Sequence, residues 1–157
     1  MPDAPRSGED ARGYRFCLVA ARFNEAYVQR LVETAVEVLT RHGATPEDLE
    51  TVWVPGALEL PLACRWAAAS GRFDALLAFG VILRGETEHF RIVAGQSAEG
   101  LMRVGLDTGV PVLNGVLAAH HVGQVTDRTG GIHGNRGAET ALAALRMAQL
   151  RRRMGAR

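Results

Sequence analysis

Lysine is absent from this sequence of 157 residues, and all 18 of its basic residues are arginine. A Schiff-base aldolase or a pyridoxal phosphate enzyme needs a lysine amine, and a Walker A loop needs its lysine on the nucleotide phosphates. The absence therefore excludes these classes of site. The formal net charge is only +1, so no strong overall charge favours nucleic acid or an anionic membrane as partner.

Cysteine and long apolar runs are also scarce. Cys17 and Cys64 lie far apart in apolar segments, so we expect reduced core thiols. No apolar run approaches the ~20 residues that span a bilayer, and the first residues lack the apolar segment of a signal peptide. We therefore expect a cytoplasmic protein without a membrane partner. His120, His121 and His133 have no Cys, Asp or Glu at a recognised ligand spacing, so we expect no metal.

Hydrophobic periodicity predicts alternating strands and helices. Strands are expected near residues 14–20, 49–54, 75–83 and 111–117, and helices near 24–43, 58–70, 89–106 and 136–153, with Asn24 as the first N-cap and a polar loop over 120–134. This order predicts an α/β fold of three layers, α/β/α, with an open, mostly parallel sheet of about four strands in flavodoxin-like order. We interpret residues 1–13 as a flexible N-terminal arm able to add a strand to a neighbouring subunit, and residues 14–157 as a single domain.

Ligands of open α/β sheets bind beyond the carboxyl ends of the strands. The segments directly after the predicted strands are 21–24, 55–59 and 84–89, together with Asn114 at the fourth strand. We expect these four segments to converge at one rim of the sheet.

The turn formed by Gly85, Glu86 and Thr87 brings free backbone N–H groups, a hydroxyl and a helix start together, which favours phosphate binding. His89, two residues later, can exchange protons at neutral pH. The alternative is an ordinary cap, in which Thr87 closes the helix and His89 is solvated on its first turn. Spacing alone leaves both interpretations open.

Other residues near these turns also have two interpretations. Phe23 is either a hydrophobic staple or an aromatic platform for a flat ligand. Glu59 either caps a helix or accepts hydrogen bonds from a polyol. Arg128 and Arg136, in and after the glycine-rich loop, either reach a phosphate or are solvated.

Several motifs, in this order, resemble those of the lumazine synthase family, and the similarity covers residues 14–150. The motifs are ARFN at 21–24, VPGALELP at 54–61, GVILRGETEHF at 80–90, PVLNGVL at 111–117, DRTG at 127–130 and GNRG at 134–137. The resemblance implies an enzyme that condenses 5-amino-6-(D-ribitylamino)uracil with 3,4-dihydroxy-2-butanone 4-phosphate. The products are 6,7-dimethyl-8-ribityllumazine, phosphate and water, as in riboflavin biosynthesis, and no cofactor is needed.

The resemblance also implies roles for individual residues. His89 would transfer protons, and Gly85, Glu86 and Thr87 would hold the phosphate with Arg128 as a charged clamp. The residues implied for the ring and the ribityl chain of the other substrate are Phe23, Ala57, Leu58, Glu59, Val81, Ile82, Leu83 and Asn114.

An assembly is implied as well: a homopentamer with active sites between subunits, and in some members a 60-mer built of pentamers. The glycine-rich loop has no insertion relative to a GTKAGNKG-like family pattern, which favours the shell. Two departures stand out, since residues 117–121 read LAAHH where many members have an LTTEN-like segment, and Ile132 replaces a lysine. These departures motivate an alternative, a lumazine- or flavin-binding or cage-forming paralogue without turnover.

Overall fold

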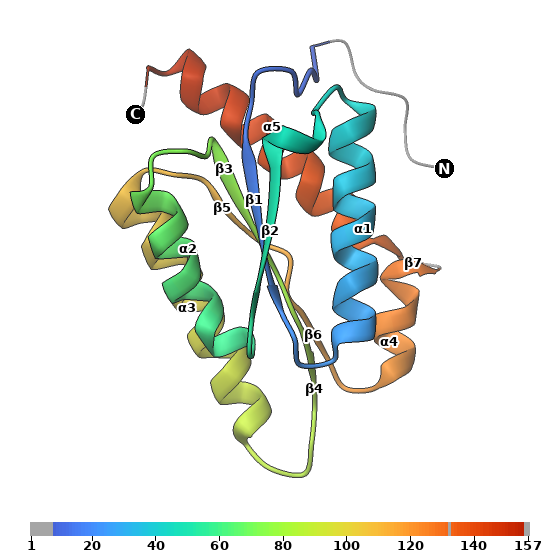
Figure 1. The fold of residues 1–157 in the computed structure, drawn as a ribbon. Coiled ribbons are helices and arrows are strands. Elements are labelled where there is room, and N and C mark those ends of the chain that lie inside the picture. The colour runs from blue at the N-terminus through green and yellow to red at the C-terminus, as the bar shows by residue number, and fades with distance from the viewer. Residues whose placement is uncertain (1–7, 132, 156–157) are drawn as a thin grey trace.

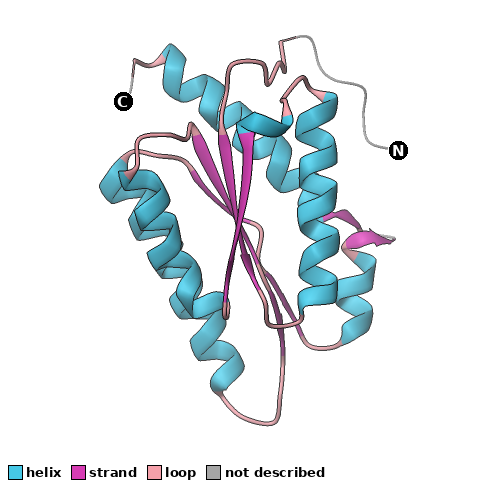
Figure 2. Ribbon diagram, viewed as in Figure 1, coloured by secondary structure: helices cyan, strands magenta, loops and turns pink. Residues whose placement is uncertain are grey.

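The chain folds into three layers, with a sheet between two layers of helices (Figures 1 and 2). The computed structural model describes residues 8–131 and 133–155. Helices α2 (Leu60–Ala69) and α3 (His89–Thr108) cover one face of the sheet, and α1 (Glu25–Arg41) and α5 (Arg136–Arg153) cover the other. The predicted α/β/α architecture is therefore confirmed.

The main sheet is parallel and has the strand order β2-β1-β3-β5. Its strands are β1 (Phe16–Ala21), β2 (Leu49–Val54), β3 (Ala75–Phe79) and β5 (Val112–Asn114), and this is the predicted flavodoxin-like order. Every residue of β1 and β3 is buried, as expected of central strands covered on both faces. Alternate β1 side chains enter two separate cores, since Leu18 packs towards α1 and α5 whereas Val19 packs towards α2 and α3.

The strands predicted as continuous over 75–83 and 111–117 are in fact each interrupted. β4 (Val81–Leu83) and β6 (Leu117–Ala119) form their own short parallel ladder beyond the main sheet (Figure 1). The interruption has a steric cause, because a Cβ at Gly115 would lie 2.6 Å from the Phe79 ring. The backbone passes close to Phe79 there, and pairing resumes when Leu117 N–H donates to the Gly80 carbonyl at 2.9 Å.

The prediction of an irregular loop over 120–134 is wrong for most of that stretch. It contains helix α4 (Val122–Asp127) and a small antiparallel hairpin of β7 (Thr129–Gly131) and β8 (Gly134–Asn135). Val125, fully buried in the core beside α1, anchors the helix. One buried side chain in a polar stretch is too short a pattern for periodicity to reveal. Ile132 lies outside the described residues.

Two helix predictions had different outcomes. Asn24 precedes α1 but does not cap it with its side chain; it has a left-handed φ of 60° and donates from Nδ2 to the Val81 carbonyl at 2.8 Å. The third helix forms as predicted despite its glycines. At Gly100 a Cβ would lie 2.6 Å from the Pro61 ring, so glycine allows α2 and α3 to approach closely.

Residues 8–13, which the sequence placed in the arm, lie against the chain's own helices. Ala11 is fully buried and its N–H donates to the His42 carbonyl at 2.9 Å. Glu9 forms an ion pair of 2.7 Å with Arg146 on α5. Residues 1–7 lie outside the described part of the chain, so the strand expected for a neighbouring subunit stays a prediction.

None of the helices in the described part of the chain combines the length and apolar character that a bilayer-spanning helix requires.

Candidate functional site

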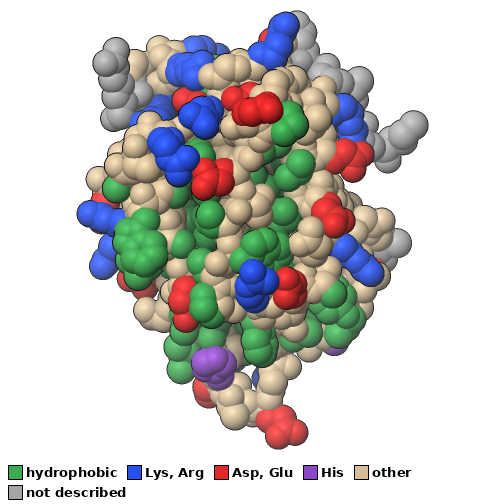
Figure 3. All heavy atoms as spheres, viewed as in Figure 1, with side chains coloured by type: hydrophobic (Ala, Val, Ile, Leu, Met, Phe, Trp, Pro, Cys, Tyr) green, Lys and Arg blue, Asp and Glu red, His purple; other side chains and the backbone are tan. Residues whose placement is uncertain are grey.

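A cavity of about 430 Å³ opens at the carboxyl ends of β1, β2 and β4. Its lining is mainly apolar, and Figure 3 shows apolar side chains at the surface near the lower end of this face. The residues around it are Ala21, Phe23, Gly56, Ala57, Leu58, Glu59, Val81, Ile82, Leu83, Gly85, Thr87, His89, Phe90 and Val93. This size and lining suit a small, flat organic ligand.

Phe23 stands at the mouth of the cavity with 73% of its surface exposed. Its backbone is held in place, because its N–H donates to the Pro55 carbonyl at 3.2 Å and Arg22 N–H donates to the Val54 carbonyl at 2.8 Å. A staple would be packed against the following helix. The exposure therefore favours the aromatic platform.

Ala57, Leu58 and Glu59 form a 3₁₀ turn (Ala57–Glu59) that leads from β2 into α2. Glu59 occupies the N-cap position of α2, yet its carboxylate makes no capping hydrogen bond to that helix. The carboxylate is exposed and lines the cavity, so it can accept hydrogen bonds from a ligand with hydroxyl groups. The geometry thus favours the binding interpretation over the capping one.

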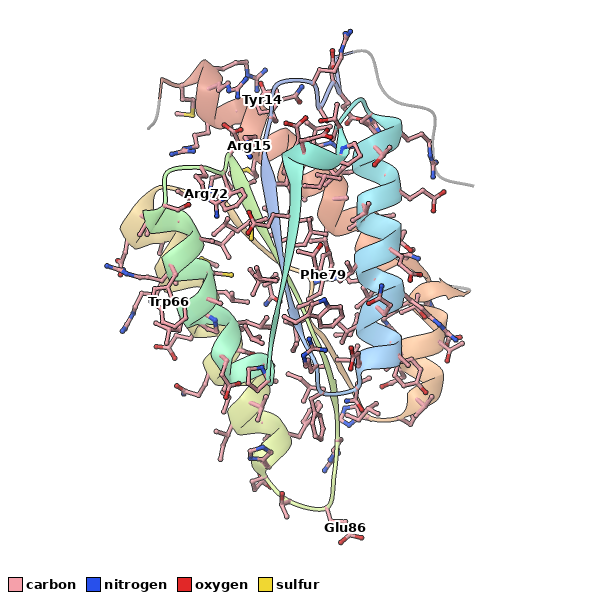
Figure 4. The ribbon with its side chains drawn as sticks, in the orientation of Figure 1. Tyr14, Arg15, Trp66, Arg72, Phe79 and Glu86 are labelled. Carbon is pink, nitrogen blue, oxygen red and sulfur yellow. The ribbon has the colours of Figure 1, made fainter. Side chains whose placement is uncertain are left out.

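The turn between β4 and α3 combines both interpretations that the sequence allowed. Thr87 Oγ1 accepts a hydrogen bond at 3.3 Å from the N–H of His89, the first residue of α3, although the N-cap position is Glu88, whose side chain makes no capping bond. Gly85, Thr87 and His89 nevertheless all line the cavity. Glu86 lies at the tip of the turn and points away from the molecule in Figure 4, so only its backbone is placed for a ligand. An anion here would meet the backbone of an exposed turn at the N-terminus of a twenty-residue helix.

The expected convergence at one rim holds for the first three segments and is wrong for Asn114 within a single chain. Asn114 pairs with Ala78 in the main sheet, whereas the cavity lies further on, beside β4. The interruption after β3 and β5 separates the main sheet, where Asn114 lies, from β4 and the cavity. Asn114 instead borders a groove between α3 and α5, and its Oδ1 accepts from Val116 N–H at 3.0 Å.

Arg128 is also absent from the cavity lining. It borders a separate recess of about 400 Å³ together with His133, Arg136 and Glu139. Arg128 Nη1 donates to the Gln124 carbonyl at 3.1 Å, and Arg136 Nη2 donates to the Asn114 carbonyl at 3.2 Å. Arg136 also has a buried Nε without a hydrogen-bond partner. Arg136 Nη1 lies 3.9 Å from the Glu139 carboxylate, so the recess holds two arginines and one carboxylate, and we call it the arginine recess.

Sequence reasoning interpreted Asn24 only as a helix N-cap and assigned no role in the site to Phe90. Asn24 ties the loop after β1 to β4 through the Val81 carbonyl, and Phe90 forms part of the cavity wall next to His89. Phe90 ends the GVILRGETEHF motif, so its position in that motif was the available signal. The role of Asn24 had no signal, since its bond joins residues 57 positions apart in the chain.

The two thiols are not nucleophiles at neutral pH. Burial raises the pKa of Cys17 and of Cys64 to about 12, so neither is a thiolate at neutral pH. Both are free cysteines in the core. Within the described ranges no group of three or more His, Cys, Asp or Glu residues is arranged to hold a metal ion.

Comparison with known proteins agrees with this arrangement. The family profile described as 6,7-dimethyl-8-ribityllumazine synthase matches residues 13–152. Proteins of that name from Gemmatimonas aurantiaca and Chlorobaculum parvum are 47% and 42% identical over 145 residues, covering 92% of this chain and 88% and 93% of those proteins. One from Prosthecochloris aestuarii is 44% identical over 141 residues, covering 90% of this chain and 91% of that protein. The chain therefore belongs to the 6,7-dimethyl-8-ribityllumazine synthase family.

Proposed function

We propose that this chain catalyses the condensation of 5-amino-6-(D-ribitylamino)uracil with 3,4-dihydroxy-2-butanone 4-phosphate to 6,7-dimethyl-8-ribityllumazine, phosphate and water. The observation that carries the proposal is the cavity itself, where an aromatic platform, an exposed turn suited to an anion and a histidine line one space. Relatives that carry the name of this synthase match nearly the whole chain.

The cavity offers distinct contacts to the pyrimidine substrate. Phe23 stacks on the ring, while Val81, Ile82 and Leu83 form the wall that faces its edge. The short turn with Ala57, Leu58 and Glu59 receives the ribityl chain, whose hydroxyls donate to the Glu59 carboxylate. Together these contacts hold the substrate amine facing the residues that follow β4.

The chemistry then needs proton transfer and held geometry, and the protein supplies both. The substrate amine is the nucleophile that attacks the ketone, so neither a lysine nor a redox cofactor is required. His89 accepts and returns protons as phosphate leaves and the second ring closes. The backbone of Gly85, Glu86 and Thr87 stabilises the departing phosphate, and proximity of the two substrates can lower the barrier by about 7 to 11 kcal/mol in favourable cases.

Phosphate recognition is completed, in this proposal, by a second copy of the chain. The cavity holds no arginine, whereas the arginine recess holds Arg128 and Arg136 but no aromatic platform. A heterologous contact that places the arginine recess of one subunit against the cavity of the next would unite them, and such contacts close into rings. Arg136 or His133, which both border the recess, would then take the place of the family lysine that Ile132 replaces.

Exposed apolar side chains support an oligomer. On α2 and α3, Leu62, Trp66, Met102 and Leu106 are between 54% and 77% exposed, and Trp66 points outward from α2 in Figure 4. Apolar surface of this extent is typical of subunit contacts. We propose a pentamer with sites between subunits, assembled into a sixty-subunit shell, in the reducing cytoplasm that the free thiols suit.

The direct test is to mix the purified protein with both substrates and follow the fluorescent lumazine. We expect product to form faster than in buffer alone. Product at the buffer rate, with the uracil substrate still tightly bound, would support the binding paralogue and contradict the enzyme. Light scattering in physiological salt tests the assembly, and a mass corresponding to one pentamer would contradict the shell.

A further inference from the structure

His120 contacts both ends of the segment that carries the anion-binding turn. At the start of this 84–90 segment, Arg84 Nη1 lies 3.3 Å from His120 Nδ1. At its end, the rings of Phe90 and His120 are in contact, with centroids 5.7 Å apart and planes tilted by 35°. The turn of 85–87 and His89 lie between these two contacts. The imidazole therefore bridges the ends of the segment on which phosphate binding and proton transfer depend.

The position of His120 is itself fixed by the fold. Its N–H donates to Gln124 Oε1 at 2.7 Å, which ties it to α4. Arg84 N–H donates to the Ala119 carbonyl at 2.9 Å, so the β4–β6 ladder continues to the residue beside His120. Arg84 and His120 each directly follow their strand, and their side chains meet because these two strands are paired.

The 84–90 segment has few other attachments. All residues from 84 to 89 are exposed. In the described part of the chain, the side chains from 86 to 89 form hydrogen bonds or ion pairs only with near neighbours, namely Thr87 with His89 N–H and Glu88 with Arg91. Without the contacts of His120, only the backbone connections to β4 and to α3 would hold the turn in place.

We propose that His120 is a positioning residue that fixes the anion-binding turn and His89 against the cavity, and that it does so as the neutral imidazole. A guanidinium only donates hydrogen bonds, so Nδ1 has to accept from Arg84 and the ring proton has to sit on Nε2. This role rests on the proposed function, because it matters only if the turn binds phosphate.

Acid should weaken this contact. The charged groups that face His120 are Arg84 after β4 and Arg128 directly after α4, which borders the same small recess, while α3 presents the apolar Phe90. His121 is its neighbour in the chain, and among the described residues no carboxylate bonds to the His120 ring. A second proton would remove the acceptor at Nδ1 and place a positive charge beside Arg84.

Amide hydrogen exchange tests whether His120 holds the 84–90 segment in place, and it does not require enzyme activity. In His120→Ala, we expect the bonded amides of Arg84, Arg91 and Ile92 to exchange about threefold to tenfold faster, as for loss of one ordinary side-chain hydrogen bond. Peptides from β1 and α5 should not change. His121→Ala, the adjacent histidine whose side chain makes no capping bond, is the matched control and should behave as wild type. Unchanged exchange in His120→Ala, or faster exchange throughout the chain, would overturn the proposal.

Steady-state kinetics test the consequence. We expect His120→Ala to raise KM for the butanone phosphate by about threefold to tenfold while KM for the uracil substrate stays constant. His120→Asn, which keeps an acceptor near Nδ1, should recover most of the loss. Acid should raise KM for the butanone phosphate more in wild type than in His120→Asn, because only the imidazole loses its acceptor at Nδ1 when it gains a second proton. Equal changes in both KM values would overturn the role, whereas a wild type without turnover would refute the enzyme and leave the exchange result valid.

Discussion

The cavity beside β4 and the arginine recess beside α4 differ in almost every chemical respect. The cavity is mainly apolar, with Phe23 at its mouth and His89 on its wall. The arginine recess is polar and is lined by Arg128 and Arg136. One region suits a flat ring and proton transfer, and the other suits an anion. The comparison suggests that the chain distributes one task over two surfaces.

The separation follows from the backbone rather than from side chains. The sheet is interrupted between β3 and β4 and again between β5 and β6, where Gly115 passes close to Phe79. β4 carries its residues on to the cavity, whereas β6 leads into α4 and the arginine recess. The two surfaces are therefore fixed on opposite sides of one short ladder.

The largest expected effect is that of His89→Ala. Removing a proton-transfer group from the cavity should lower kcat on the order of a hundredfold while the affinity for the uracil substrate changes little. Stopped-flow measurement of lumazine formation, with binding followed separately by fluorescence, distinguishes the two quantities. His121→Ala should keep wild-type kcat. A loss that appears only in binding would assign His89 to recognition instead of catalysis.

Arg128→Ala tests the arginine recess. Losing a charge-assisted contact of about 2 kcal/mol should raise KM for the phosphorylated substrate by about thirtyfold, with KM for the uracil substrate unchanged. Arg41→Ala, which removes an exposed ion pair at the far end of α1, is the control for loss of an arginine. If both substrates lost affinity equally, the recess would not be a phosphate site.

Phe23→Ala should affect the other substrate. Stacking on the ring contributes roughly 1 to 3 kcal/mol to binding, so its loss should raise KM for the uracil substrate by about tenfold. KM for the butanone phosphate should change little. Phe23→Trp keeps an aromatic platform and should restore binding. Failure of the tryptophan to do so would point to a simple packing role.

Gly115→Ala should act on stability more than on either surface. Its methyl group would overlap the Phe79 ring, and overpacking of this kind costs about 1 to 3 kcal/mol of unfolding free energy. Chemical denaturation of the variant measures this directly. Gly95→Ala is the matched control, because a Cβ there meets nothing within 4 Å and should stabilise α3 by up to about 1 kcal/mol.

The layers and the place of the cavity were predictable from sequence because local patterns locate the strands and helices, and the connection rules of α/β sheets then restrict the strand order. Apolar periodicity located β1 and α1, and the rule that ligands bind beyond strand ends located the turn at Gly85. The interruption at Gly115 was not predictable, because it depends on Phe79, a residue distant in the chain. For the same reason the sequence grouped Arg128 with His89, although one chain places them in different recesses.

Mixing two impaired variants tests the division of labour most directly. His89→Ala keeps an intact arginine recess, and Arg128→Ala keeps an intact cavity. When the two variants are co-expressed in equal amounts, random assembly should create complete sites at about a quarter of all interfaces. At a low concentration of the butanone phosphate, this should restore about a quarter of wild-type activity. Activity no greater than the sum of the separate variants would contradict a site shared between subunits.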